Sequence, residues 1–380
     1  MEEDILQTRT INLMRFPLII GVIFLHNLSY PSPSFTTHNI FSVTYFDIYS
    51  FLNISITLLS RAAVPCFFLI SGYLFYYNLK SFTLCDYKMK ILRRVRSLFL
   101  PYILWNSIAI GVSSFFIIKN ILGGSCSFTD LYTLFDNNGW LRLFWDCKGT
   151  GIYSKNIFGF TIYNSPNPID WPLWYLRDLI IVSILSPAIY IFIKKTGSIG
   201  IYILLLLYVT QTWVNITGFS IKAVSFFSLG AFLSINKKNI ILHMKKIDKI
   251  SLSIFVILFP IAIYGEYNKN PIFSIAHQIM LLALIPVIFN IHRIIAEKYK
   301  NLSGGVLSKS SFFIYALHTI LIIQISTSLC NIFFFGDEEW SLIPRYIFTP
   351  FVCSLICLII YIVISKLFPK ITKLLTGYRF

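Results

Sequence analysis

Two ionisable side chains, Arg15 and His26, lie within the first long apolar stretch of the chain. In an α-helix the eleven residues from one to the other return to within about 20° of the starting direction, so both share one face. They are ~16 Å apart along the axis, about half the thickness of a membrane's hydrocarbon core. A cation and an imidazole facing lipid would be costly. We therefore expect this face to point into a protein or water-filled interior and to serve function.

The composition is that of a membrane protein. The chain has 380 residues, 56% of them hydrophobic and 13% charged, with a mean hydropathy of +0.72. It is too apolar for a soluble two-domain protein. We predict an all-α polytopic membrane protein in which residues 1–380 form a single domain. The apolar runs indicate about ten membrane-spanning helices. They lie near residues 11–29, 54–77, 98–118, 171–193, 199–214, 220–235, 250–265, 272–292, 311–334 and 344–366.

The charge distribution predicts the orientation in the membrane. The formal net charge is +16, and most of the 32 Lys and Arg residues fall in alternate connections between these spans. An excess of basic residues marks cytoplasmic loops, so both termini are expected in the cytoplasm, with a basic cytoplasmic loop at about 78–97. This distribution gives no reason to expect a nucleic-acid partner. The polar first ten residues and the lack of a cleavage site indicate a retained first helix, not a signal peptide.

A long loop at about 119–170 is expected on the outer side. Its Trp, Asn and Gly residues suit contact with carbohydrate or lipid headgroups, or a lid. Cys126 and Cys147 share this loop and would be free to pair in an oxidising compartment. No His, Cys or carboxylate cluster has metal-ligand spacing, so no metal site is expected. The absence of a Gly-rich nucleotide loop argues against a dinucleotide fold or an ATP-driven pump.

The second apolar span carries a charge beside a proline. Pro65 cannot donate to the carbonyl of Arg61, which frees a polar backbone group beside a charged side chain. Ser71, followed by glycine, adds a hydroxyl and a point of close backbone approach. By the expected topology Arg61 lies toward the outer face, at a depth similar to that of His26. The alternative is that Arg61 extends to the membrane surface from the start of its helix.

Three further polar or aromatic candidates lie in later spans. Trp174 fits a substrate contact or the aromatic belt at the membrane interface. Arg177 must be neutralised by Asp178, water or a substrate. His318 is expected about two turns into its span from the cytoplasmic side, and so at a different depth from His26. Its role is either packing or a place along a donor channel.

These segments together resemble the acyltransferase 3 family of integral membrane acyltransferases. The resemblance runs in order over nearly the whole chain. It rests on Arg15 and His26, on RAAVPCFFLISGY from Arg61 to Tyr73, and on LWYLRD (173–178), FFSLGA (226–231) and SFFIYALH (311–318). It implies a bacterial inner-membrane enzyme with no bound cofactor. Such an enzyme takes an acyl group, by default acetyl, from cytoplasmic acyl-CoA. The group is delivered to a hydroxyl of a cell-envelope glycan or lipid-linked saccharide at the outer face.

The resemblance also implies roles for residues. His26 would act as general base on the sugar hydroxyl, or would carry the acyl group covalently. Arg61 would stabilise the oxyanion or hold the acyl carbonyl, and Arg15 would guide the donor. Substrate or donor contacts are expected from Ser71, Trp174, Arg177 and His318. A basic stretch would receive the CoA phosphates or, alternatively, attract anionic lipids. It comprises Lys88, Lys90, Arg93, Arg94 and Arg96.

A second function class remains open from the sequence. Intramembrane arginines, a histidine and Pro-interrupted helices would equally serve a transporter that moves a glycan or an acyl group without making bonds. No inverted repeat is visible, which disfavours the common carrier folds.

Overall fold

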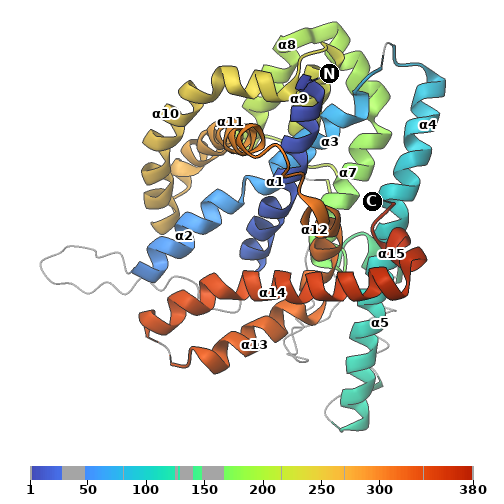
Figure 1. Ribbon diagram of the computed structural model, residues 1–380, viewed down its shortest axis with the longest axis vertical. Helices are drawn as coiled ribbons and strands as arrows, with labels where there is room; N and C mark the ends of the chain where they lie inside the picture. Colours follow the sequence, from blue (N-terminus) through green and yellow to red (C-terminus); the bar gives the residue numbers. More distant parts are fainter. Residues whose placement is uncertain are drawn as a thin grey trace, which may run out of the picture.

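The structure is a computed structural model, and it describes residues 2–27, 48–79, 81–124, 127–128, 140–147, 167–214, 216–268, 270–336 and 338–378. Throughout these ranges the regular structure is helical, without strands (Figure 1). The longer helices are α1 (Glu2–His26), α2 (Ile48–Ser60), α3 (Ala63–Tyr76), α4 (Leu84–Arg94), α5 (Leu100–Leu122), α7 (Trp174–Ile184), α8 (Ser186–Thr210), α9 (Ile221–Ile235), α10 (Ile240–Tyr267), α11 (Ser274–Lys298), α12 (Gly305–Leu317), α13 (Ile323–Phe333), α14 (Glu339–Leu367) and α15 (Pro369–Leu375). Short helical segments are η1 (Val95–Phe99), η2 (Trp140–Phe144), η3 (Trp171–Leu173), η4 (Pro271–Phe273) and η5 (His318–Ile322).

Eight helical segments of the described chain are long and apolar enough to cross a membrane. This confirms the all-α polytopic class, but the expected count of about ten is not reproduced. The predicted fourth span, 171–193, is divided, because α7 ends at Ile184 and Pro187 opens the helix α8. Proline suits a first helical turn because its missing amide hydrogen is not needed there. Within α8 the backbone leaves helical geometry at Gly197 (φ 60°, ψ −136°), between the predicted fourth span and the predicted fifth span, 199–214. Lys194 and Lys195, expected in a loop, lie in the last turn before this kink.

Besides α8, two of the spanning segments are interrupted near their middle. The segment Ile48–Tyr76 breaks at Arg61 and Ala62, directly before Pro65, as expected from the missing amide hydrogen. The segment Gly305–Phe333 breaks at η5, where Ile320 and Leu321 leave helical geometry and Leu321 has a φ of 71°. Non-helical backbone at membrane depth occurs where it is buried in protein or lines a cavity, so both breaks are candidate functional positions.

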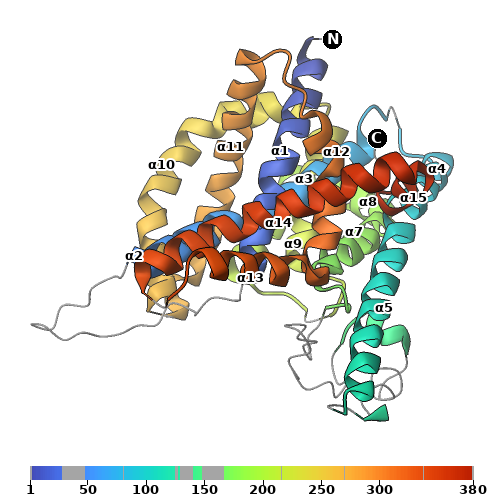
Figure 2. The same ribbon diagram turned by 60° about the horizontal axis from the view of Figure 1, so that its bottom comes forward.

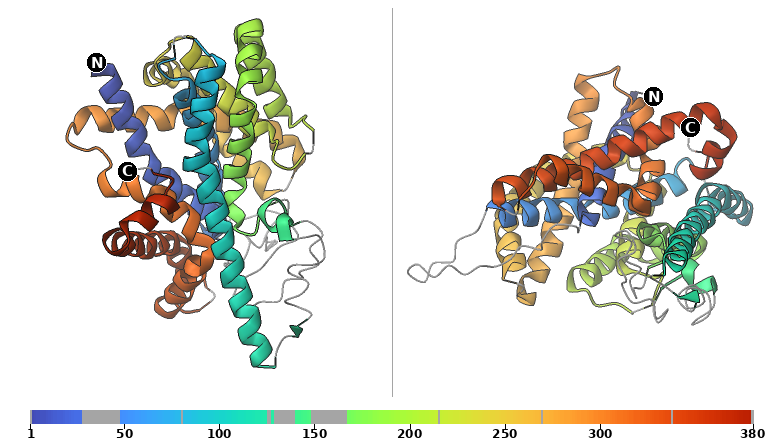
Figure 3. Two further views of the ribbon diagram at one scale, coloured as in Figure 1. Left: turned by 90° about the vertical axis from the view of Figure 1, so that its right-hand side faces the viewer. Right: turned by 90° about the horizontal axis from the view of Figure 1, so that it is seen from below.

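The expected basic loop at 78–97 is helical from Leu84 onward. Thr83 and Asp86 form a capping box that starts α4, and the π-helical η1 joins α4 to α5 in one long rod (Figure 3, left). None of the residues of α4 is buried, as suits a basic amphipathic helix at a membrane surface. The rod therefore carries the basic residues on a rigid support.

Helix α1 lies inside the bundle, with α11 and α12 beside it and α14 crossing it (Figure 2). The Arg9 guanidinium donates to the carbonyl of Ala296 over 2.9 Å, which joins the start of α1 to the end of α11. The two helices therefore run in opposite directions. The closest helix packing is between α3 and α9, where a Cβ added to Gly72 would lie 2.0 Å from the carbonyl oxygen of Phe227.

Candidate functional site

His26 ends α1 and meets two aromatic rings from distant parts of the chain. Its ring centroid lies 5.3 Å from that of His318 in η5 and 5.1 Å from that of Trp171 in η3. The expectation that His318 lies at a different depth from His26 is therefore wrong. That expectation counted turns from a span beginning near residue 311, whereas α12 begins at Gly305 and runs without a break to Leu317, so His318 lies about 9 Å deeper in its segment than expected. His26 itself is partly exposed.

Hydrogen bonding determines which nitrogen of His318 carries a proton. Nδ1 of His318 lies 2.8 Å from the carbonyl oxygen of Tyr315, and since a carbonyl only accepts, Nδ1 must carry the hydrogen. Nε2 of neutral His318 is then a bare acceptor. Within the described structure, this Nε2 and Nδ1 of His26 are buried without hydrogen-bond partners. Buried polar atoms of this kind are normally satisfied, so a water or a substrate group is expected between the rings.

A buried carboxyl, which the sequence did not single out as a site, holds the same region together. Asp170 is 2% exposed, and its Oδ1 accepts a 3.0 Å hydrogen bond from the hydroxyl of Thr319, the neighbour of His318. The Tyr315 hydroxyl donates to the carbonyl of Pro172. The two contacts join η3 and the residue before it to the end of α12 and the start of η5, so Trp171 and His318 are both held close to His26. In the sequence, the only indication of this link between η3 and η5 is Pro172, in the run Asp170-Trp-Pro.

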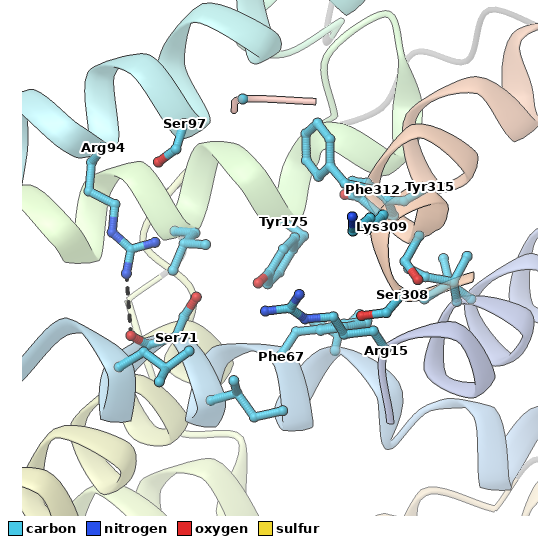
Figure 4. A pocket seen from close by; sticks show the side chains of 18 of the residues that line it. Arg15, Phe67, Ser71, Arg94, Ser97, Tyr175, Ser308, Lys309, Phe312 and Tyr315 are labelled. Carbon is cyan, nitrogen blue, oxygen red and sulfur yellow. Dashed lines mark hydrogen bonds between the residues drawn. The ribbon is translucent and has the colours of Figure 1, made fainter. Parts of the chain in front are cut away.

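A cavity of about 350 Å³ lies near this centre, on the side of the molecule on which α12 begins and α3 ends, and its lining stops short of His26 and His318 (Figure 4). Arg15, Ile19 and Val22 line it from α1, at the spacing of one helix face. His26 is one turn beyond Val22 on that face, and Tyr315, which also lines the cavity, is one turn before His318. The prediction that the Arg15 face points into an interior is thus confirmed.

The cavity has three cationic side chains, Arg15, Arg94 and Lys309, and several hydroxyls. Arg94 comes from the end of α4 and donates over 3.3 Å to the carbonyl of Ser71, which also lines the cavity. Lys309 was missed by the sequence reasoning, because nothing in its own segment shows that it faces Arg15. Hydroxyls come from Ser71, Ser97, Tyr175, Ser308, Ser311, Tyr315 and Tyr378.

The other basic residues of α4 and η1 do not line the cavity. Lys88, Arg93 and Arg96 are exposed, and the Lys90 ammonium lies 6.0 Å from the ring centroid of Phe75. Contact with the donor through these four side chains stays a prediction. Their exposure fits the alternative, attraction to anionic lipid, at least as well.

Arg61 lies at the break between α2 and α3 and pairs with α10. Its guanidinium donates to both carboxylate oxygens of Glu266, over 2.7 and 3.1 Å, and its Nη1 lies 3.5 Å from Nε2 of His277 in α11. Planar two-bond pairing of this kind fixes both side chains. The predicted role of Arg61 in stabilising an oxyanion stays a prediction, since its contacts are with α10 and α11.

The antiparallel packing of α1 and α11 relates Arg61 to His26 in depth. His26 lies seventeen residues after Arg9 in α1. In α11, Ile279 lies seventeen residues before Ala296 and two positions from His277. His277 and its neighbour Arg61 therefore lie toward the same end of the α1–α11 pair as His26.

The class of enzyme follows from the similarity of the chain to known proteins. A family model for the acyltransferase domain, Acyl_transf_3, matches residues 9–365. The chain belongs to the acyltransferase 3 family. This multi-pass membrane acyltransferase is also similar to the succinoglycan biosynthesis protein ExoH of Rhizobium meliloti (strain 1021). The two are 26% identical over 381 residues, which covers 97% of this chain and 92% of the relative. No solved structure matches the chain significantly.

Arg177 and Trp174 have local partners in the acyltransferase. Arg177 is buried, donates to Asp178 over 3.0 and 3.2 Å, and donates to the carbonyl of Trp145 over 2.6 Å. These contacts neutralise its charge without a substrate. The Trp174 ring faces the Lys222 ammonium at 5.8 Å. A substrate role for Arg177 or Trp174 stays a prediction.

Two further expectations concern residues that the structure describes only in part. Cys126 and most of the expected outer loop 119–170 lie outside the described residues, so the pairing of Cys126 with Cys147 stays a prediction. Within the described ranges no group of three His, Cys, Asp or Glu side chains is placed to hold a metal ion.

Proposed function

We propose that this acyltransferase moves an acyl group from acyl-CoA, bound from the cytoplasm, to a hydroxyl of a cell-envelope glycan or lipid-linked saccharide in the bacterial inner membrane. The observation that carries the proposal is the cationic cavity that ends one helical turn from both His26 and His318. The relative named for succinoglycan biosynthesis supports a saccharide acceptor. Acetyl is the acyl group to test first, because acetyl-CoA is the family's expected donor.

The cavity suits a long anionic thioester. Arg15, Arg94 and Lys309 can each neutralise a phosphate oxygen of CoA, and the two arginines can bind phosphate through paired hydrogen bonds. A volume of about 350 Å³ holds only part of CoA, so the acyl-carrying arm would lie inside and the nucleotide outside. The thioester carbonyl would then lie beside His26.

His26 would supply general base catalysis. A sugar hydroxyl oxygen attacks the thioester carbonyl carbon, a C–O bond forms, and Nε2 of His26 takes the hydroxyl proton. The C–S bond breaks, and the CoA thiolate receives that proton from His26. Nε2 of His318 would accept the Nδ1 hydrogen of His26 through one water, which keeps Nε2 of His26 free to act as the base. The ester product and free CoA then leave.

The decisive experiment compares purified wild type with His26→Ala and His26→Gln. Each protein receives radiolabelled acetyl-CoA and a lipid-linked glycan extract from cells that lack this acyltransferase. Loss of a general base is expected to lower label transfer about 10²–10⁴-fold while acetyl-CoA binding persists. His292→Gln in α11 serves as the control. Equal transfer by wild type and His26→Gln would remove His26 from the mechanism. Binding of acetyl-CoA without any transfer by wild type would contradict the proposed donor and acceptor.

A further inference from the structure

A second cavity lies at the end of the α10–α11 hairpin, toward the same end of the α1–α11 pair as His26, and the proposed mechanism does not use it. We call this cavity the outer pocket. It has a volume of about 300 Å³ and is lined by Ala262, Gly265, Glu266, Asn270, Phe273, Ser274 and His277. A carboxylate, an amide, a hydroxyl and an imidazole thus converge beside one aromatic ring. The cationic cavity is lined from other helices, so the two cavities can be occupied together.

The polar groups of the outer pocket are held in place. Glu266 accepts two hydrogen bonds from Arg61, and the same guanidinium lies 3.5 Å from Nε2 of His277. Asn270 accepts a 3.0 Å hydrogen bond from the amide of Ile272 through Oδ1, which leaves its NH₂ group as a donor. The residues of this pocket are therefore fixed by contacts with the chain before any ligand arrives.

Phe273 forms the aromatic side of the outer pocket, and Gly265 makes room for it. A Cβ at Gly265 would lie 2.3 Å from Cβ of Phe273, so the Phe273 side chain packs directly on the backbone of α10. Its ring also meets that of Tyr264 edge-on, with centroids 5.6 Å apart. A fixed ring beside polar groups offers an apolar face together with hydrogen-bonding partners.

Charged and aromatic side chains connect the outer pocket with the catalytic centre. Lys222 interacts electrostatically with Arg61, and its ammonium lies 5.8 Å from the Trp174 ring. Trp174 follows Trp171 by one turn, and Trp171 meets His26 at 5.1 Å. A chain of linked sugars has hydroxyls along its whole length and can contact such a series of residues at several points.

We propose that the outer pocket binds a saccharide unit of the acceptor glycan, adjacent to the unit that receives the acyl group. This assignment rests on the proposed function. Sugar hydroxyls both donate and accept hydrogen bonds, which matches the carboxylate of Glu266, the amide of Asn270 and the hydroxyl of Ser274. The Phe273 ring would pack on the apolar face of the sugar ring. Glu266 and Asn270 are positions that the sequence alone did not single out.

The kinetic test uses Asn270→Ala and Ser274→Ala, which leave the Arg61–Glu266 pair intact, together with Glu266→Gln. Each variant is assayed with radiolabelled acetyl-CoA and the lipid-linked glycan extract over a range of extract concentrations. The concentration for half-maximal transfer should rise about tenfold per lost hydrogen bond, with the KM for acetyl-CoA unchanged. Glu297→Gln is the matched control, because it removes a paired carboxylate at the opposite end of α11.

Labelling tests occupancy of the pocket directly. In intact cells an impermeant maleimide should label Ser274→Cys, made in a Cys85→Ser, Cys126→Ser background, and the glycan extract should protect the purified variant from labelling. Protection by phospholipid vesicles alone would show a headgroup pocket and overturn the proposal. Unchanged half-maximal acceptor concentrations in an active enzyme would also overturn it. Absence of transfer by wild type would instead contradict the proposed function, and that result is known before any variant is compared.

Discussion

At the scale of single residues, the carbonyl of Tyr315 sets the chemistry of the histidine pair. Because it accepts the Nδ1 hydrogen of His318 over 2.8 Å, His318 presents only an acceptor toward the end of α1. His26 can be held in one tautomer by that acceptor, much as a carboxylate orients the histidine of a hydrolytic triad. His318 is on this view a positioning residue, which acts on the substrate through His26.

We therefore expect His318→Leu to lower kcat roughly 10²-fold while the KM for acetyl-CoA changes less than about twofold. His318→Gln, whose amide oxygen can still accept a hydrogen bond, should recover part of the activity and shift the pH profile of kcat. His292→Gln is the matched control, since Nδ1 of His292 also lies 2.8 Å from a carbonyl oxygen, that of Ile288. Equal activity of the Leu and Gln variants at His318 would contradict the positioning role.

The cationic cavity gives a second prediction at residue scale. Arg94→Gln removes a cation that lines the cavity and should raise the KM for acetyl-CoA about tenfold, since a charge-assisted hydrogen bond to phosphate contributes about 1.5–3 kcal/mol. The KM for the acceptor extract should not change. Lys246→Gln, an exposed cation on α10, is the control. Equal effects of both substitutions would indicate a general influence of charge and not a donor contact.

At the scale of elements, the two broken segments differ in how far the sequence predicts them. Pro65 lies next to the first break and removes a backbone hydrogen bond there, but Pro17, Pro260 and Pro286 lie within continuous helices, so proline alone does not predict a break. No residue type marks the second break, where Ile320 and Leu321 are ordinary residues of an apolar helix and depart from helical geometry. The sequence thus places Arg15 and His26 on one face correctly but cannot bring His318 to them.

Helix packing gives a prediction of its own, at the contact between α3 and α9. A Cβ at Gly72 would lie 2.0 Å from the carbonyl oxygen of Phe227, and one at Gly230 would lie 2.0 Å from that of Leu69. Gly72→Ala and Gly230→Ala should each force the helices apart and cost about 1–3 kcal/mol or more. The measurement is the melting temperature in detergent. Gly111→Ala, where a Cβ meets nothing within 4 Å, should leave it unchanged or raise it.

At the scale of the whole molecule, the cationic cavity is lined by residues from both ends of the chain. Arg15 comes from the first helix and Tyr378 from the last residue described, and a Cβ at Gly377 would lie 2.4 Å from the carbonyl oxygen of Ser97. The Trp105 indole also donates to the carbonyl of Leu375 over 3.0 Å. No local pattern predicts such contacts between distant segments. The sequence therefore identifies Arg15, Ser71 and Arg94 but not the walls that Lys309 and Tyr378 supply.

The arrangement of the two cavities predicts sidedness. The cationic cavity lies beside the start of α12, on the side that the positive-inside pattern assigns to the cytoplasm, and the outer pocket lies at the end of α10 and the start of α11. Acetyl-CoA added outside sealed inside-out vesicles should support glycan labelling. The same addition to sealed right-side-out vesicles should give less than about a tenth of that rate until detergent opens them, because a charged thioester does not cross the bilayer. Equal labelling in both sealed preparations would mean that the donor enters from the outer face, and the orientation inferred from the basic residues would then be wrong.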